Sequence, residues 1–163
     1  MSEPIHSKTV ILATGTKHRT LGLANEENLI GKQIHFCAVC DGNFYKGKKV
    51  VMVGGGNSAF VEANLLADIA SELVMLQDMP IFTAEAKLQE QLLSRSNVET
   101  HVNTKVLEYV VSDNKLTGVK YSENGEEKLI ECGFISTSLG KRVLRTETAS
   151  LAFLSMINYE WMV

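Results

Sequence analysis

A glycine-rich turn between a predicted strand and a predicted helix constrains this chain more than any other feature. Gly54-Gly55-Gly56-Asn57-Ser58-Ala59 follows the apolar run 50–53 and precedes residues with helical spacing of apolar side chains. In a G-x-G-x-x-A loop, the first glycine makes the tight turn and the second lets the backbone approach a pyrophosphate. The small last residue lets the helix pack close to the strand, and the helix N-terminus faces the anion. The loop predicts a dinucleotide site, with a glycine turn that binds nothing as the alternative.

The segments around this loop predict alternating strands and helices. Apolar residues recur at Ala59, Ala63, Leu66 and Ala70, which indicates a helix over 58–70. The runs 50–53 and 73–76 are apolar throughout, as in strands that are buried on both faces of a sheet. A second helix is predicted after Thr83 as its cap, with Glu85 in the first turn and apolar residues at 88, 92 and 93. A third strand is predicted at 98–102, so this part favours a parallel sheet.

The remaining segments predict a different kind of sheet. Extended segments at 106–111, 116–121 and 129–132 are separated by the turn sequences Asp113-Asn114 and Asn124-Gly125, which predicts an antiparallel meander. A last apolar strand is expected at 134–139. A buried strand is also expected at 9–16, residues 17–35 are interpreted as a connector, and 37–47 as a loop or short helix.

The end of the second strand predicts which nucleotide is preferred. About 20 residues past the glycine loop, an acidic residue bonds the ribose of NAD, whereas arginine accommodates the additional phosphate of NADP. This end carries Gln77 and Asp78, and no Arg or Lys occurs from 71 to 86. We therefore expect NAD(H) rather than NADP(H), with Asp78 or Gln77 bonding the ribose. The alternative for Asp78 is a solvated turn residue before Pro80.

Two cysteines at Cys-x-x-Cys spacing form the second candidate site. Cys37 and Cys40 have the spacing of a short redox disulfide, and a redox cysteine must be able to ionise. His35 is close in sequence, and Asp41 can pass protons. Half of a zinc site and two inert thiols remain as alternatives, although structural zinc needs four ligands. Cys132, the third cysteine, is interpreted as a small core residue, and no metal ligand is assigned.

Charge and composition exclude several classes of protein. The 163 residues carry a net charge of −3, whereas nucleic-acid-binding surfaces are basic, so nucleic acid is not an expected partner. No stretch reaches the roughly 18 apolar residues of a membrane span. The N-terminus lacks the basic start and apolar stretch of a secretory signal. Three cysteines are too few for a secreted disulfide framework, and we expect a cytoplasmic protein.

The order of the two motifs resembles the thioredoxin reductase family, which includes the flavoprotein component of alkyl hydroperoxide reductase. The similarity covers residues 9–140 and implies an α/β fold, a Rossmann-like three-layer domain in which the antiparallel meander accompanies the parallel sheet. The matching residues are Ala13-Thr14-Gly15, Cys37 to Gly42, Gly47-Lys48-Lys49-Val50, Gly54 to Ala59, Glu62-Ala63 and Ala67-Asp68-Ile69-Ala70.

The resemblance implies a role for each cysteine. In the family, hydride passes from NAD(P)H to FAD, and electrons then pass to a Cys pair and on to a protein disulfide. Carried over, Cys40 faces the flavin, Cys37 attacks the partner disulfide and Asp41 donates or accepts the proton. The implied partner is a thioredoxin-like or peroxiredoxin-type protein. The stretch from Gln77 to Glu85 looks more like the NADH-using peroxide reductase branch than like thioredoxin reductases, which carry arginines there.

The resemblance also implies a division of the chain. Residues 1–16 correspond to a strand that links to the FAD domain, 17–140 to the NAD(P)-binding domain with its Cys-x-x-Cys motif, and 141–163 to no part of the family. The glycine loop and the Gly-Asp motif of the FAD domain are not found in this sequence, so we interpret the chain as a truncated relative without its own complete FAD site. The alternative is a non-catalytic module that binds NAD(H) or a protein partner.

The last residues are expected to serve packing or self-association. Residues 141–163 contain no glycine and cannot supply a flavin-binding loop, and helix is the mild preference around 149–154. Leu151, Phe153, Leu154 and Trp161 belong to an apolar-rich stretch. If it were exposed, such a stretch would favour association, and we expect a homodimer.

Overall fold

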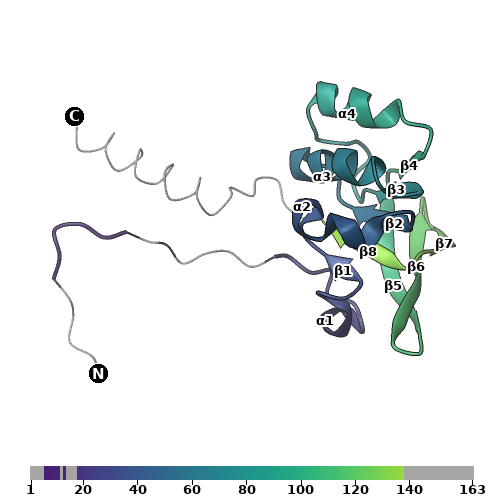
Figure 1. Cartoon of the computed structure of the whole chain (residues 1–163), viewed down its shortest axis with the longest axis horizontal. Coiled ribbons are helices and arrows are strands. Elements are labelled where there is room, and N and C mark those ends of the chain that lie inside the picture. Colours follow the sequence, from purple (N-terminus) through teal and green to yellow (C-terminus); the bar gives the residue numbers. More distant parts are fainter. Residues whose placement is uncertain (1–5, 12, 14–17, 138–163) are drawn as a thin grey trace. The chain divides into compact units, whose positions relative to one another are not determined.

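The computed structural model describes residues 6–11, 13 and 18–137 (Figure 1). The chain divides into two units, and all helices and strands of the described residues lie in the unit formed by residues 18–142. None of the described helices is long and apolar enough to cross a membrane. The predicted tail at 141–163, with its helix and its role in association, lies outside the described residues, as do residues 138 and 139 of the predicted last strand.

The centre of the unit is a five-stranded sheet in which all neighbouring strands are parallel, with the order β1-β8-β2-β3-β4. The strands predicted from the apolar runs at 50–53, 73–76 and 134–139 are present. The bounds are Ile34–His35 for β1, Lys49–Val53 for β2, Glu72–Leu76 for β3, Val98–His101 for β4 and Phe134–Thr137 for β8.

Helices α3 (Asn57–Ala67) and α4 (Ala86–Leu93) connect β2 to β3 and β3 to β4. The predicted helix over 58–70 ends earlier, at Ala67, and the side-chain amide of Asn97 donates to the carbonyls of Ala67 and Ala70 at this end. The prediction that Thr83 caps α4 is wrong, since the N-cap is Glu85. Thr83 donates its backbone N–H to the carbonyl of Gly55 instead, at 2.9 Å.

Burial on both faces of the sheet explains the three layers. Along β2, Val50 and Met52 belong to the core cluster that contains α3, and Val51 and Val53 belong to the cluster that contains the antiparallel strands. Because successive side chains of a strand point to opposite faces, this alternation places the helices on one face and the second sheet on the other. The continuous apolar run at 50–53 is therefore required by two different cores.

The second sheet is the predicted meander, with order β5-β6-β7 and antiparallel neighbours. Its strands are β5 (Thr104–Ser112), β6 (Lys115–Glu123) and β7 (Glu126–Glu131). Both turns have positive φ at their two central residues, 51° and 59° at Asp113 and Asn114, and 50° and 91° at Asn124 and Gly125. Two-residue hairpin turns require this conformation, which Asn, Asp and Gly adopt most readily. Both hairpin predictions are confirmed.

Residues 17–35 contain more structure than the predicted connector. They include α1 (Glu26–Leu29) and β1. Glu26 is buried, and its carboxylate accepts backbone N–H bonds from Leu21, Gly22 and Leu23 and the hydroxyl of Tyr109 on β5. A local turn is thus fixed by a residue 83 positions away, which no sequence periodicity reveals.

The strand predicted at 9–16 is not formed at residues 9–11 and 13, and its other residues lie outside the described part. Val10 and Ile11 are exposed, so neither has the buried environment that the apolar run indicated. Segment 37–47 forms two short helices, α2 (Ala38–Asp41) and the 3-10 helix η1 (Gly42–Tyr45), as the loop or short helix prediction allowed.

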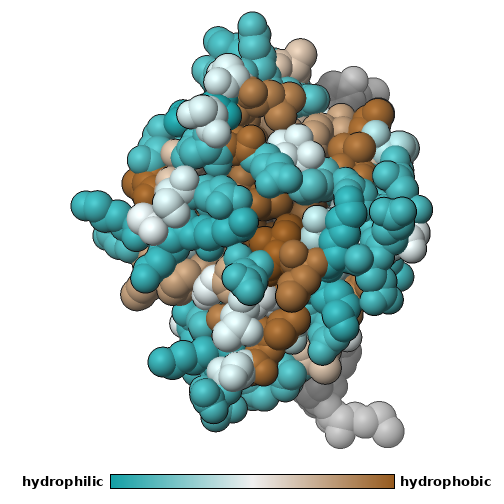
Figure 2. Space-filling model, turned by 90° about the vertical axis from the view of Figure 1, so that its right-hand side faces the viewer, coloured by the Kyte–Doolittle hydropathy of each residue, from teal (hydrophilic) through white to brown (hydrophobic). Residues whose placement is uncertain are grey.

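The surface of the unit is not uniformly polar. Figure 2 shows hydrophobic residues in the middle of one face with hydrophilic residues around them. Exposed large hydrophobic side chains include Leu129 on β7, Val39 on α2 and Phe44 on η1. Single exposed apolar residues are common on proteins, but Val39 and Phe44 lie on the two short helices next to the cysteines.

Packing between β6 and β7 predicts the effect of Gly118→Ala. A Cβ at Gly118 would lie 2.7 Å from the backbone carbonyl oxygen of Ile130, and backbone in a paired strand cannot move away cheaply. We expect this substitution to lower the free energy of unfolding by about 1–3 kcal/mol, as overpacking does, measured by urea denaturation. Gly133→Ala is the control, because its Cβ would meet nothing within 4 Å. Equal stability of the two variants would contradict the packing described for β6 and β7.

Candidate functional site

The glycine loop follows β2 at the carboxyl edge of the parallel sheet. Gly54 has a φ of 131°, a conformation that side chains rarely permit, and its N–H donates to the carbonyl of Leu76 at 2.9 Å. Gly56 is the N-cap of α3 and no side chain caps the helix. The first backbone N–H groups of a helix, here from Asn57 to Ala59, have no partner inside it. The loop therefore presents free donors where the carboxyl end of a strand meets a helix N-terminus, an arrangement that suits an anion.

The strand order also favours a ligand site at the carboxyl edge of the parallel sheet. From β2 the chain moves to β3 on one side, whereas β8 lies on the other side. In open parallel sheets, ligands bind outside the carboxyl ends of the strands at such a switch point. The sequence-predicted cofactor residues Gly54 to Ala59, and the end of β3 with Gln77 and Asp78, lie on neighbouring strands at this edge.

Gly55 and Gln77 are packed against each other. A Cβ at Gly55 would lie 2.6 Å from Cδ of Gln77 and 2.8 Å from Cδ1 of Phe82. Gln77 is buried and its amide nitrogen donates to the carbonyl of Ile81. Gly55 thus leaves room for a buried side chain below the loop, which is a reason for this glycine besides ligand approach. Asp78 is exposed and is the predicted ribose-binding residue that solvent can reach.

A second acidic residue lies at this edge. The N–H of Glu85 donates to Oδ1 of Asn57 at 2.7 Å, and Nδ2 of Asn57 donates to Oε1 of Glu85 at 3.0 Å. This reciprocal pair holds the carboxylate of Glu85 at the first residue of α3. In the sequence, Glu85 stood out in the first turn of a predicted helix and in the stretch that resembles the NADH-using branch, whereas its contact with Asn57 across 28 residues has no local signal.

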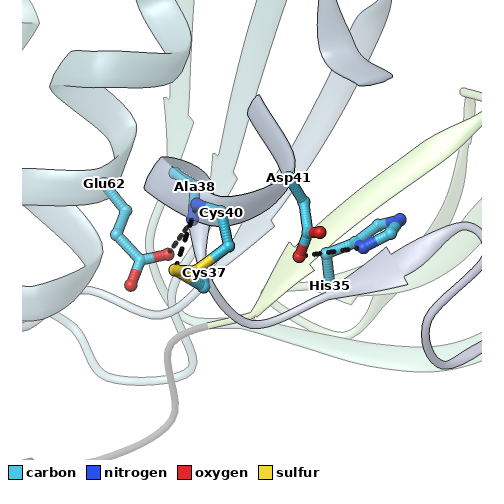
Figure 3. Close-up of a disulfide and its surroundings, with 6 residues drawn as sticks. All are labelled: His35, Cys37, Ala38, Cys40, Asp41 and Glu62. Carbon is cyan, nitrogen blue, oxygen red and sulfur yellow. Dashed lines mark hydrogen bonds and ion pairs between the residues drawn. A yellow bond between two sulfur atoms is a disulfide. The ribbon is translucent and has the colours of Figure 1, made fainter. Parts of the chain in front are cut away.

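The two cysteines lie at the start of α2 and are joined as a disulfide (Figure 3). Cys37 is the N-cap, and its sulfur accepts the N–H of Cys40 at 3.2 Å. In this form the sulfurs are bonded to each other and are not available as zinc ligands. Among the described residues, no group of three or more His, Cys, Asp and Glu side chains could hold a metal ion.

Asp41 and His35 contact each other beside the disulfide. Oδ2 of Asp41 lies 3.2 Å from Nδ1 of His35, which is buried in β1. The His35 ring also packs against Phe44 and Tyr45, with ring centroids 5.6 Å away in both cases. His35 therefore orients the Asp41 carboxylate, and Figure 3 shows the two side chains on one side of the cysteine pair.

Glu62 lies on the other side of the cysteine pair and was not among the predicted site residues. It comes from α3, and Oε2 accepts the backbone N–H of Ala38 at 3.3 Å. Burial raises the pKa of the Glu62 carboxyl from its ordinary value of 4.5 to about 7, although the hydrogen bond from Ala38 opposes the shift. In the sequence, Glu62 appeared as a polar position in an apolar helix and among the residues that match the family, and these two signals could have suggested it.

Comparison with known proteins agrees with this geometry. A family model described as "Pyridine nucleotide-disulphide oxidoreductase" matches residues 2–154. A thioredoxin reductase from Mycoplasma genitalium is 41% identical over 134 residues, which are 80% of this chain and 42% of the relative. One component of the alkyl hydroperoxide reductase of Staphylococcus aureus is 39% identical over 138 residues, 83% of this chain and 27% of the relative. The chain thus spans less than half of the length of these curated relatives.

Solved structures show the same fold. A crystal structure of T. acidophilum thioredoxin reductase matches 78% of this chain and 42% of that chain, with a TM-score of 0.73 and 36% sequence identity. A thioredoxin reductase from Lactococcus lactis matches 78% of this chain and 43% of that chain, also with a TM-score of 0.73 and with 27% identity. The predicted fold class, a Rossmann-like three-layer domain with a parallel sheet and a meander, is confirmed.

The surroundings of the three cysteines predict different reactivity. Cys132 is buried, which raises the pKa of its thiol from 9.0 to about 12. Because the thiolate is the nucleophile, we expect iodoacetamide to modify Cys37 and Cys40 of the dithiothreitol-reduced protein and to spare Cys132 until urea is added. Mass spectrometry of the unreduced protein should show the Cys37–Cys40 peptide lacking two hydrogens, with Cys132 free as the internal control. A main product that links Cys132 to either cysteine would contradict this arrangement.

Proposed function

The chain belongs to the pyridine nucleotide-disulphide oxidoreductase family, and we propose that it forms the nicotinamide-nucleotide domain of a thioredoxin reductase-like enzyme. One observation carries the proposal: a glycine loop suited to a pyrophosphate and a Cys-x-x-Cys disulfide occur in the same unit. A nucleotide loop alone fits many dehydrogenases, and a cysteine pair alone fits many redox proteins. Their combination favours the transfer of electrons between a nicotinamide and a disulfide.

In this proposal the cysteine pair is the last electron carrier. The Cys37–Cys40 disulfide takes up two electrons and two protons and becomes a dithiol. The thiolate of Cys37 then attacks the disulfide of a thioredoxin-like or peroxiredoxin-type protein and forms a mixed disulfide, which Cys40 resolves by re-forming the Cys37–Cys40 bond. The partner protein leaves as a dithiol, so electrons and protons balance. Asp41, oriented by His35, exchanges a proton with the pair.

The residues at the carboxyl edge of the sheet fit a nicotinamide dinucleotide. The pyrophosphate would contact the loop Gly54-Gly55-Gly56 and the N–H groups of Asn57, Ser58 and Ala59, and the ribose would bond Asp78. When bound, NADH supplies a hydride, which family enzymes pass on through FAD. The described residues contain one glycine-rich strand-to-helix loop, and we assign it to the nicotinamide nucleotide and place the flavin outside this unit.

The charge at this edge favours NAD(H) over NADP(H). Asp78 is exposed at the end of β3, and Glu85 is held at the start of α3. A carboxylate and a phosphate about 4 Å apart repel each other by about 4 kcal/mol at an effective dielectric constant near 20. Exposure to solvent and salt reduces this to about 1–2 kcal/mol, which still corresponds to roughly a tenfold difference in affinity.

Calorimetric titration of the full chain with NADH and NADPH tests this assignment. We expect NADH to bind about tenfold more tightly than NADPH, and Asp78→Asn to reduce that difference. Glu131→Gln is the control, because it removes the same charge from an exposed position on β7. Tighter binding of NADPH would contradict the assigned selectivity, and no binding of either nucleotide would contradict the proposed function.

A further inference from the structure

Three polar side chains are buried close to the short helices that carry the cysteine pair. They are His35 on β1, Tyr45 on η1 and Ser136 on β8, and none is more than 4% exposed. Nε2 of His35 and the hydroxyl oxygens of Tyr45 and Ser136 make no well-formed hydrogen bond with another described residue. Unpaired polar atoms are rare in protein interiors, because each loses its hydration without compensation. Three of them in one place indicate that they serve one another.

His35 and Ser136 lie side by side on one face of the parallel sheet. The two residues are paired in register between β1 and β8. The residues that precede them, Ile34 and Ile135, belong to the core that contains the meander. Because successive side chains of a strand point to opposite faces, His35 and Ser136 both point to the face that the helices cover.

Tyr45 reaches the same place from η1. Its ring packs edge-on against the rings of His35 and Phe134, with centroids 5.6 and 5.7 Å away, and Phe134 lies on the same face of β8 as Ser136. Burial raises the pKa of the Tyr45 hydroxyl, and Ser136, as a neighbour able to form a hydrogen bond, opposes this rise. Since hydroxyl hydrogens rotate freely, the two hydroxyls can pair without movement of the backbone.

The other ring nitrogen of His35 faces Asp41. Nδ1 lies 3.2 Å from Oδ2 of the carboxylate, and Figure 3 marks this contact with a dashed line. An ionised carboxylate can only accept hydrogen bonds, so a hydrogen bond between these two atoms requires a hydrogen on Nδ1. In a neutral imidazole, Nε2 is then an acceptor. Nε2 therefore needs a donor, and the Ser136 hydroxyl is beside it.

We propose that the three buried side chains form a hydrogen-bond network that positions the Asp41 carboxylate for proton exchange with the cysteine pair. The Tyr45 hydroxyl donates to Oγ of Ser136, and the Ser136 hydroxyl donates to Nε2 of His35. Nδ1–H of His35 then donates to Oδ2 of Asp41, so that Oδ1 remains for the proton that the cysteine pair releases or takes up. Every hydrogen of the network stays on its own donor. His35 and Ser136 are thus positioning residues, and the proton role stays with Asp41.

This proposal rests on the proposed redox role of the cysteine pair, but its first test needs no electron transfer. In the oxidised full chain labelled with ¹⁵N-histidine, long-range ¹H–¹⁵N spectra at mildly alkaline pH distinguish an imidazole that carries its hydrogen on Nδ1 from one that carries it on Nε2. We expect the Nδ1–H form for His35, whose signals are assigned by their loss in His35→Phe. A His35 ring in the Nε2–H form, or with hydrogens on both nitrogens, would overturn the proposal.

The same spectra test the contact with Ser136. In Ser136→Ala we expect the Nε2 resonance of His35 to shift downfield, towards that of an imidazole nitrogen without a donor, because the hydroxyl is lost. Thr137→Val is the matched control. Thr137 is also buried and its hydroxyl also lacks a partner among the described residues, but as the next residue of β8 it faces the meander. An unmoved resonance in Ser136→Ala, or an equal shift in Thr137→Val, would reject the network.

A double-mutant cycle tests whether the network acts through Asp41. The measured quantity is the rate at which dithiothreitol reduces the disulfide, a reaction in which dithiothreitol becomes its cyclic disulfide and the two cysteines become thiols. His35→Phe keeps an aromatic ring against Phe44 and Tyr45 but donates nothing to Asp41, and we expect it to slow reduction about three- to tenfold. In the Asp41→Asn background the same substitution should slow it less than about twofold. Equal slowing in both backgrounds, as a purely structural role predicts, or no slowing in either, would overturn the proposal.

Titration with NADH distinguishes a failure of this network from a failure of the proposed function. The glycine loop contains none of the four residues of the network, so Ser136→Ala should bind NADH as tightly as the unmodified protein does. Absence of NADH binding by both proteins would contradict the proposed function. Normal binding together with an unmoved Nε2 resonance would reject the network alone.

Discussion

Burial of β2 and β3 on both faces is the constraint on which the rest of this structure depends. Val51 and Val74 face the meander, and Met52 and Met75 face the helices, so neither strand has a side that tolerates polar residues. Such strands must end abruptly where polar groups can meet solvent, and β2 ends in Gly54-Gly55-Gly56. The glycine loop, to which we assign the nucleotide, thus lies where the two-sided packing of the sheet ends.

The sequence predicted those parts of the fold that depend on local patterns. The parallel strands follow from apolar runs, and the meander follows from turn residues such as Asn124-Gly125, whose φ angles are positive. It did not predict α1, which depends on the buried carboxylate of Glu26, or the start of α4 at Glu85 rather than Thr83. These elements are set by contacts between distant residues, which leave no periodic signal.

The candidate site likewise has parts that the sequence predicted and parts that only the structure revealed. Its two motifs, the glycine loop and the Cys-x-x-Cys pair, were visible because each is continuous in sequence. The contacts of Glu62 with Ala38 and of Glu85 with Asn57, across 24 and 28 residues, became visible only in three dimensions. Both are acidic residues beside a motif: Glu85 lies next to the glycine loop, and the half-buried Glu62 lies next to the start of the helix that carries the disulfide. Motifs in the sequence thus indicated the candidate sites, and packing brought further polar residues next to them.

We propose that the carboxyl edge of the parallel sheet holds a nicotinamide nucleotide in the unit that carries the redox disulfide. Mapping NADH onto the backbone amide resonances of the ¹⁵N-labelled full chain tests this most directly. We expect changes concentrated at the amides of Gly54 to Ala59 and at Asp78, with little change along β6 and β7. Changes confined to the meander, or none at saturating NADH, would contradict it.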